Sequence, residues 1–271
     1  MVRVVAVANQ KGGVGKTTTT VSVAAALGRA GHPTLVIDLD PQANASQALG
    51  IDRSFGSPSV YEVLLDGASI ADVVLETNEP NVSCVTSSVD LAGAEVELVG
   101  LANREGRLAA AIEAMSSGEA EAPGLGAPEI VLIDCPPSLG LLTVNALVAA
   151  DELLVPVQAE FYALDGVGQL IRTMELVRTA LNPRLQISLV VLTMIGPPTS
   201  AQDHIVDQVR AFFGDRLAPT MIPRDPALCE APILGSTVMS LSPHSSGASA
   251  YVDLARDLLA VQITTGKNIK I

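Results

Sequence analysis

A glycine-rich run near the start of the sequence has the residue types of a phosphate-binding loop. Residues 11–18 read Lys-Gly-Gly-Val-Gly-Lys-Thr-Thr, between a β-branched run and a helical stretch. Glycines let backbone N–H groups turn towards an anion, and the helix N-terminus adds unpaired donors. Lys16 would reach the β- and γ-phosphates of a nucleotide, and the Thr17 hydroxyl would ligate Mg²⁺. The loop residues predicted to bind a nucleotide are Lys11, Gly12, Gly13, Val14, Gly15, Lys16, Thr17 and Thr18.

Aspartates follow two later apolar runs. Asp38 and Asp40 come after residues 34–37, and Asp134 comes after residues 130–133. Ligands of doubly wound sheets bind outside the carboxyl ends of the strands, so these carboxylates are expected to face the phosphates. Asp134 suits a carboxylate that holds Mg²⁺ through water. A single strand-end aspartate is more often a turn former or a helix cap, but three motifs in this order favour a nucleotide site.

Short apolar runs that alternate with helical stretches must position these residues. Parallel strands joined by helices form right-handed βαβ units. The predicted fold class is therefore α/β, doubly wound, with a mainly parallel sheet and helices on both faces. We expect a single domain over residues 1–271, with a flexible surface loop near 116–128. Strands are expected near 2–8, 34–38, 82–86, 130–134, 153–156 and 187–194, and helices near 16–30, 103–116, 141–150, 165–181, 202–213 and 247–262.

Composition excludes several classes of protein. Apolar residues make up 48% of the chain, too many for an intrinsically disordered protein, and no apolar run reaches the ~18–20 residues of a membrane span. The net charge is −13, with 7 basic and 17 acidic side chains in residues 1–135 and 9 and 12 in residues 136–271. A protein that coats a phosphate backbone over its whole surface is excluded, whereas a basic patch in the second half is not. The first residues form a strand-like run without a signal peptide, which predicts a cytoplasmic protein.

The phosphate loop departs from the standard Gly-x-x-x-x-Gly-Lys-Thr form in a way that points to one family. Gln10 replaces the first glycine and Lys11 opens the loop, which resembles the deviant Walker A motif of the ParA/Soj and MinD class of P-loop ATPases. The resemblance implies that Lys11 reaches across a dimer interface to the partner's nucleotide, in the manner of an arginine finger. It assigns Asp40 to the attacking water and places Asp38 near the lysine and the metal. The implied catalytic residues are Lys11, Lys16 and Asp40, and the implied metal residues are Thr17, Asp38 and Asp134.

The resemblance extends along most of the chain. Residues 155–166 are similar to the strand and helix that follow Walker B in Soj-type proteins, and residues 222–235 are similar to their C-terminal signature. In that family, Pro223 and the residue at Asp225 would line the adenine pocket. The chain has no Asn-Lys-x-Asp motif of the kind that reads guanine, so the implied cofactors are ATP and Mg²⁺.

DNA binding is the point at which the sequence and the family differ. Soj-like proteins bind DNA without sequence preference through arginines, and three of those places carry no arginine here: residues 196–199, Ala227, and residues 246–247. We therefore expect non-specific DNA binding that is weak at physiological salt, with a possible association with the nucleoid. The candidate DNA contacts are Arg224, Arg210 and Arg216.

Two other members of the class make different predictions. MinD-like membrane targeting needs a basic amphipathic C-terminal helix, whereas the last helix here carries Asp253, Arg256 and Asp257, so no membrane partner is expected. The iron–sulfur relatives need paired cysteines, and no Cys-x-x-Cys pair is present. No protein-built transition-metal site is expected either, because the three histidines lack ligand spacing.

The implied function is that of an ATP-dependent dimerising ATPase for chromosome or plasmid partitioning. Hydrolysis would switch the homodimer and its binding to DNA and partners. A ParB-like or other hydrolysis-stimulating protein is the implied partner. The alternative is a positioning ATPase for a protein cargo or polar complex, with a MinD- or McdA-like role and little DNA binding.

Overall fold

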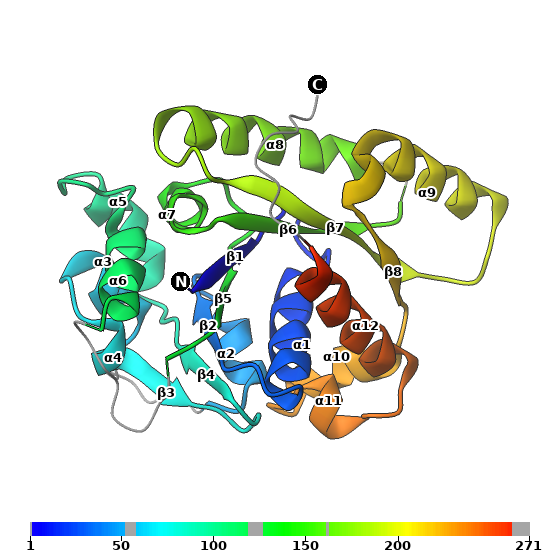
Figure 1. The fold of residues 1–271 in the computed structure, drawn as a ribbon, viewed down its shortest axis with the longest axis horizontal. Helices are drawn as coiled ribbons and strands as arrows, with labels where there is room; N and C mark the ends of the chain where they lie inside the picture. The colour runs from blue at the N-terminus through cyan, green and yellow to red at the C-terminus, as the bar shows by residue number, and fades with distance from the viewer. Residues whose placement is uncertain (1, 52–57, 119–126, 161–162, 262–271) are drawn as a thin grey trace.

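A computed structural model describes residues 2–51, 58–118, 127–160 and 163–261. Its strands form one sheet in the order β3-β4-β2-β5-β1-β6-β7-β8, in which only the β3–β4 pairing is antiparallel (Figure 1). The doubly wound α/β fold with a mainly parallel sheet is confirmed. The strands are β1 (Arg3–Val7), β2 (Thr34–Asp38), β3 (Val74–Glu76), β4 (Val82–Val85), β5 (Ile130–Asp134), β6 (Glu152–Gln158), β7 (Gln186–Ile195) and β8 (Leu217–Pro223).

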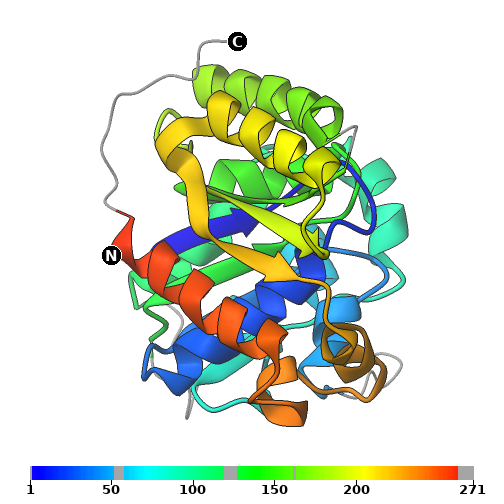
Figure 2. The same cartoon turned by 90° about the vertical axis from the view of Figure 1, so that its right-hand side faces the viewer.

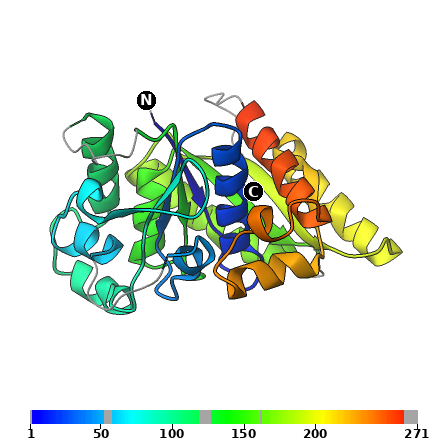
Figure 3. The same cartoon turned by 90° about the horizontal axis from the view of Figure 1, so that it is seen from below.

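Helices cover both faces of the sheet. Helices α1 and α12 lie side by side on one face, and α8 and α9 lie on the other (Figures 2 and 3). Helices α3, α5 and α6 gather beyond α7 at the β3 end of the molecule (Figure 1). The helices are α1 (Lys16–Arg29), α2 (Asn44–Ala48), α3 (Val60–Leu65), α4 (Ile70–Val73), α5 (Leu91–Leu98), α6 (Arg107–Ser116), α7 (Leu141–Ala149), α8 (Ala163–Ala180), α9 (Ser200–Phe213), α10 (Pro226–Ile233), α11 (Val238–Leu241) and α12 (Ser246–Ala260).

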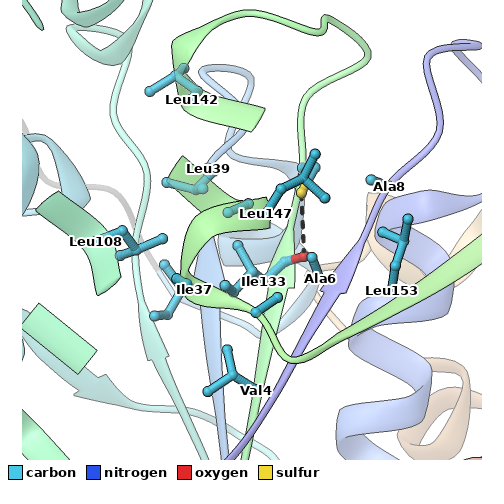
Figure 4. Packing of buried hydrophobic residues seen from close by; sticks show 14 of the residues in the cluster. Val4, Ala6, Ala8, Ile37, Leu39, Leu108, Ile133, Leu142, Leu147 and Leu153 are labelled. Carbon is cyan, nitrogen blue, oxygen red and sulfur yellow. Dashed lines mark hydrogen bonds between the residues drawn. The ribbon is translucent and has the colours of Figure 1, made fainter. Parts of the chain in front are cut away.

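The central strands are buried on both faces, which explains their unbroken apolar sequences. In β1, Val4 and Ala6 join the core beneath α7 and α8, where Figure 4 shows them near Ile133 of β5. Val5 and Val7 point to the other face and join the core with α1 and α12. Successive residues of a strand face opposite sides, so one apolar run supplies two cores.

The sequence missed elements at the margins of the sheet and in the shorter connections. Strand β8 contains Pro219 and Pro223, which lack an N–H and read as turn signals, but an edge strand tolerates them. Strand β3 is only three residues long. Helix α10 begins with Pro226 at its first turn and contains Pro232, so its pattern also reads as irregular.

The structure does not fully test two expectations about the organisation of the chain. Residues 119–126 of the loop expected near 116–128 lie outside the described residues, and α6 occupies Arg107–Ser116 before them. The single domain remains a prediction. Among the residues that the structure describes, no helix is long and apolar enough to cross a membrane.

Candidate functional site

The glycine-rich loop joins the carboxyl end of β1 to the first turn of α1. Gly13 and Gly15 have φ values of +75° and +89°, a left-handed conformation that residues with a side chain rarely adopt. Gly15 is also the N-cap of α1, so the loop runs directly into the helix N-terminus. Backbone donors and a helix terminus therefore meet at this point, as anion binding requires.

Two polar side chains that sequence reasoning missed hold the loop against the sheet. Asn9 Nδ2 donates to Pro156 O of β6 at 2.7 Å, and Asn9 Oδ1 accepts from Lys11 N at 3.1 Å. On the other side, Thr193 Oγ1 of β7 donates to Val14 O at 2.9 Å. Asn9 and Thr193 are buried, and each is a polar residue at the carboxyl end of an apolar strand, which is the signal that could have found them.

The Asp134 carboxylate accepts hydrogen bonds from two hydroxyl groups of α1. Thr17 Oγ1 donates to Asp134 Oδ2 at 2.8 Å, and Thr20 Oγ1 donates to Asp134 Oδ1 at 2.9 Å. The structure thus brings the predicted metal residues Thr17 and Asp134 together. Thr20, which the sequence analysis did not single out, completes the group.

Asp38 lies beside Asp134, because β2 and β5 pair in a register that aligns the two residues. Ser46 donates to Asp38 Oδ2 through both its backbone N–H and its hydroxyl, each at 2.8 Å. Asp40 N donates to Asp38 Oδ1 at 3.2 Å, and the Asp40 carboxylate accepts from Gln42 N at 3.0 Å. Asp38 therefore organises the segment from Asp40 to Ser46.

The site concentrates negative charge in a buried place. Burial, together with the charge of the neighbouring Asp38 carboxylate, raises the pKa of Asp134 to about 7. Burial likewise raises the pKa of Asp38 to about 6, against the hydrogen bonds from Ser46 that lower it. Burial lowers the pKa of Lys16, whose Nζ donates to Lys11 O at 3.2 Å. Two buried carboxylates that disfavour each other's charge are a fitting environment for a divalent cation.

The donor set fits Mg²⁺ bound together with a nucleotide. Among the described residues no group of three or more His, Cys, Asp or Glu side chains forms a metal cage. Magnesium does not need one, since it keeps several waters and is bound through one or two protein ligands and the substrate's phosphates. The Thr17 hydroxyl and the adjacent Asp134 carboxylate supply that kind of partial shell.

The Lys11 side chain has an ion-pair partner outside the phosphate loop. Its Nζ forms an ion pair with Glu160, two residues beyond β6, and both side chains are more than a third exposed. The lysine is thus within reach of solvent at the rim of the phosphate loop.

The residues predicted to hold adenine lie at the end of β8. Pro223 ends the strand, and Asp225 is the N-cap of α10. The Asp225 carboxylate accepts from Gly247 N at 2.7 Å, Ser246 Oγ at 2.9 Å and Ala227 N at 3.0 Å, and these bonds lower its pKa. Asp225 therefore joins the starts of α10 and α12, a structural role that the sequence did not indicate.

The three candidate DNA contacts lie on different elements. Arg210 of α9 pairs with Asp207 at 3.2 Å, and Arg216 belongs to the 3₁₀ turn after α9. Arg224 follows β8, and its Nε donates to Met194 O at 3.1 Å while its backbone N–H donates to Ile195 O at 2.9 Å. The guanidinium groups of Arg210 and Arg224 therefore have partners within the protein.

Comparison with known proteins agrees with this geometry. A family model described as an AAA domain, AAA_31, matches residues 2–187. The sporulation initiation inhibitor protein Soj of Bacillus subtilis is 42% identical over 96% of this chain and 99% of that protein. The chromosome partitioning protein ParA of Caulobacter vibrioides is 45% identical over 95% of this chain and 94% of that protein.

A solved structure is similar over nearly the whole length. Cobyrinic acid a,c-diamide synthase from Mycobacterium smegmatis, with bound ADP and magnesium, has a TM-score of 0.81 and 37% identity, covering 96% of this chain and 94% of that chain. The phosphate loop, the paired carboxylates and these matches lead to one conclusion: the chain belongs to the AAA_31 family and is a ParA/Soj-type P-loop ATPase.

Proposed function

We propose that this protein is an ATP-hydrolysing, dimerising switch for chromosome or plasmid partitioning. The observation that carries the proposal is the contact of Thr17 and Thr20 with Asp134 directly beneath the Gly13–Lys16 loop. That arrangement combines a phosphate cradle with a partial magnesium shell. The high identity to chromosome partitioning proteins supports the biological role.

Each loop residue has a distinct task in this proposal. Backbone N–H groups of residues 12–18 bind the phosphates, and Lys16 neutralises the β- and γ-phosphate charge. Bound Mg²⁺ would supply charge neutralisation between the phosphates, with Thr17 as its ligand and Asp134 holding the Thr17 hydroxyl in place. Pro223 and Asp225 border the adenine, with Asp225 acting through the hydrogen bonds that fix α10 and α12.

The segment after β2 carries the hydrolytic step. Asp40 orients the attacking water, and its carboxylate is held by Gln42 N. Asp38 contributes negative charge near the metal and keeps the 40–46 segment in place through Ser46. Because both Asp38 oxygens already accept hydrogen bonds, its main contribution is to position this segment.

Lys11 completes the site of the second subunit. In the single chain its ammonium pairs with Glu160, and in the ATP-bound dimer it would leave that carboxylate for the partner's phosphates. Hydrolysis then removes the charge that held it, and the dimer dissociates. The nucleotide thereby times the association with a ParB-like or other stimulating protein and with nucleoid DNA.

Cargo positioning is the second candidate function. It is favoured by the net charge of −13 and by the absence of arginine at residues 196–199 and at Ala227. Under this alternative the dimer binds little DNA and uses a protein scaffold as its track.

The test is ATP-dependent dimerisation, measured by light scattering. Wild-type protein should dimerise in the presence of ATP and Mg²⁺. Lys16→Ala should neither bind ATP nor dimerise. Asp40→Ala should bind ATP but hydrolyse it roughly 10²–10⁴-fold more slowly, which leaves a stable dimer. An Asp40→Ala protein that binds ATP and stays monomeric would contradict the proposal.

A further inference from the structure

Helix α5 and the turns at its two ends expose an apolar stripe that nothing in the chain covers within the described residues; Val89 precedes the helix and Val99 is its C-cap. The side chains of Val96, Val89 and Val99 are 78%, 61% and 58% exposed. Together with the exposed Ala92, these valines follow one another along the chain at intervals of three, four and three residues. Val89 belongs to the turn that leads into α5, because its carbonyl oxygen accepts a hydrogen bond from Ala92 N. Residues at this spacing share one side of a helix.

The opposite side of the same helix is already used by the fold. Leu91, Ala94 and Leu98 are fully buried in the core with α3. Helix α5 is therefore apolar on two sides, and only one of them is covered. The helix lies at the outer end of the molecule in Figure 1, and the exposed valines are on its second side. An apolar stripe of this kind on a surface marks an interaction site.

Exposed acidic residues lie beside the stripe: Asp90 follows Val89 and Glu97 follows Val96 in the chain. Tyr61 of α3 donates its hydroxyl to Glu97 Oε2 at 2.9 Å, and this hydrogen bond raises the pKa of the phenol, as do desolvation and the charges of Glu97, Asp66 and Asp90. Two arginines in this region are held by backbone carbonyls: Arg104 donates to Val99 O, and Arg107 donates to Leu65 O. Arg104 also pairs with Glu105.

We propose that this face of α5 is a docking surface for a basic amphipathic segment of a partner protein. The stripe of Val89, Ala92, Val96 and Val99 would receive its apolar side chains, and Asp66, Asp90 and Glu97 would receive its lysines or arginines. A second copy of the chain is a poorer occupant, because it would bring the same carboxylates against one another. These seven residues form the α5 surface.

The α5 surface is connected to the segments that follow β2 and β5. Ser87 N, just before α5, donates to Ser46 Oγ at 3.2 Å, and that hydroxyl donates to Asp38. On the helix itself, Glu95 Oε1 accepts from Leu142 N at the start of α7, at 3.5 Å. A Cβ on Gly140 would lie 1.9 Å from Glu95 Oε1, so the glycine makes room for this carboxylate.

A segment bound to α5 is thus placed to shift both segments that border the ATP site. This regulatory part rests on the proposed ATPase function, whereas the docking itself does not. We infer that the bound segment changes the rate of ATP turnover through Ser46 and α7 and touches no phosphate.

The binding experiment uses a synthetic amphipathic peptide with leucines at every third or fourth position and lysines between them. Its affinity for nucleotide-free wild-type protein is measured by fluorescence anisotropy. The double variant Val96→Ser/Val99→Ser should bind it at least about tenfold more weakly, since each valine loses much of its apolar burial. Leu176→Ser on α8 is the matched control, because Leu176 is 72% exposed and lies on another helix, and it should bind as wild type does.

Charge and self-association are tested separately. Asp90→Asn/Glu97→Gln should weaken binding and reduce its salt dependence. Equal affinity of wild type and Val96→Ser/Val99→Ser would overturn the proposal, as would equal binding of a peptide with glutamates in place of the lysines. Concentration-dependent self-association of wild type that Val96→Ser/Val99→Ser abolishes would assign the surface to a second copy and also overturn it.

A final comparison separates this inference from the proposed function. Lys16→Ala, which should bind no ATP, should still bind the peptide as wild type does. If that binding holds while wild type fails to hydrolyse ATP, the docking surface stands and the ATPase proposal fails. If wild type hydrolyses ATP, the peptide should change its rate of hydrolysis. Val96→Ser/Val99→Ser should have the basal rate of wild type, and the peptide should not change that rate. An equal response of both proteins to the peptide would overturn the coupling.

Discussion

Two carboxylates buried side by side are the most costly feature of the site at the scale of single residues. Asp38 and Asp134 are both inaccessible to solvent; burial raises the pKa of each, and the Asp38 charge further disfavours ionisation of Asp134. The hydroxyls of Ser46, Thr17 and Thr20 reduce this cost without removing it. A buried pair with raised pKa values is typical of a functional site, where a cation completes the charge balance.

This pair predicts how the stability of the nucleotide-free protein depends on pH. Both folded-state pKa values, about 6 and about 7, lie above that of an unfolded aspartate, so the folded state binds protons more tightly. The resulting stability is present at low pH and is lost as pH rises through these values. The melting temperature should fall by roughly 5 °C or more between pH 5 and pH 8.

Asp134→Asn should weaken the pH dependence of the melting temperature. The variant lacks the Asp134 carboxylate, and Asp38 then ionises more easily. Asp253→Asn, at an exposed ion pair with Arg256 on α12, is the control and should melt with the wild-type pH dependence. Differential scanning calorimetry at several pH values checks both variants. A nucleotide-free protein whose melting temperature rises from pH 5 to pH 8 would contradict the assignment.

The role of Lys11 across the dimer can be tested by mixing inactive subunits. In a mixed dimer of Lys11→Ala and Asp40→Ala, one site lacks both groups, and the other has Asp40 and receives Lys11 from its partner. The mixture should therefore hydrolyse ATP faster than either variant alone, as measured by phosphate release. If heterodimers form and every mixing ratio is equally inactive, Lys11 does not act in trans.

At the scale of elements, the carboxyl end of β7 links the phosphate loop to the region after β8. Thr193 donates to Val14 O in the loop, and the next residue, Met194, has a φ of +56°. Arg224 holds this unusual turn through hydrogen bonds to Met194 O and Ile195 O. The phosphate loop and the segment after β8, where we propose that adenine binds, are thus joined through one strand end.

Thr193→Val should weaken ATP binding by about tenfold while the fold is retained. Valine matches threonine in shape but leaves Val14 O without its buried donor, which costs about 1–3 kcal/mol. Thr193→Ser keeps the hydroxyl and should bind ATP nearly as wild type does. Titration with a fluorescent ATP analogue measures both variants, and a loss in Thr193→Ser without a loss in Thr193→Val would assign the effect to packing of the methyl group.

At the scale of the whole molecule, the charge distribution sets the relation to DNA. The net charge is −13, and the first half of the chain carries −10 of it. Dimerisation would double any patch formed by the arginines of the second half, yet Arg210 already pairs with Asp207. Few phosphate contacts are therefore expected.

ATP-dependent binding to random-sequence duplex should be weak at physiological salt and recovered at low salt. The logarithm of affinity falls with that of salt concentration by roughly 0.9 per phosphate contact, so a titration counts the contacts. Asp40→Ala with ATP keeps the dimer during the measurement. Absence of binding even at low salt would favour the cargo-positioning alternative, and tight binding at high salt would show that other arginines form the patch.

The sequence alone was sufficient to predict the central strands and the phosphate loop that follows β1. Strands β2 and β5 have the predicted bounds, and β1 begins and ends within a residue of its prediction, because strands buried on both faces are continuous apolar runs. The loop was recognisable for a related reason: glycine adopts the left-handed backbone of Gly13 and Gly15 far more readily than other residues do, so the requirement appears directly in the residue type.

Only the tertiary structure decided which side chains support that loop. Asn9 and Thr193 reach it because β6 and β7 lie to one side of β1, and β5 lies to the other with Asp134. The place of β1 between β5 and β6 depends on contacts between residues more than a hundred positions apart, and no local pattern encodes it. For the same reason the pairing of Lys11 with Glu160 and the exposure of the α5 valines were not predictable, since both depend on which elements the fold places beside them.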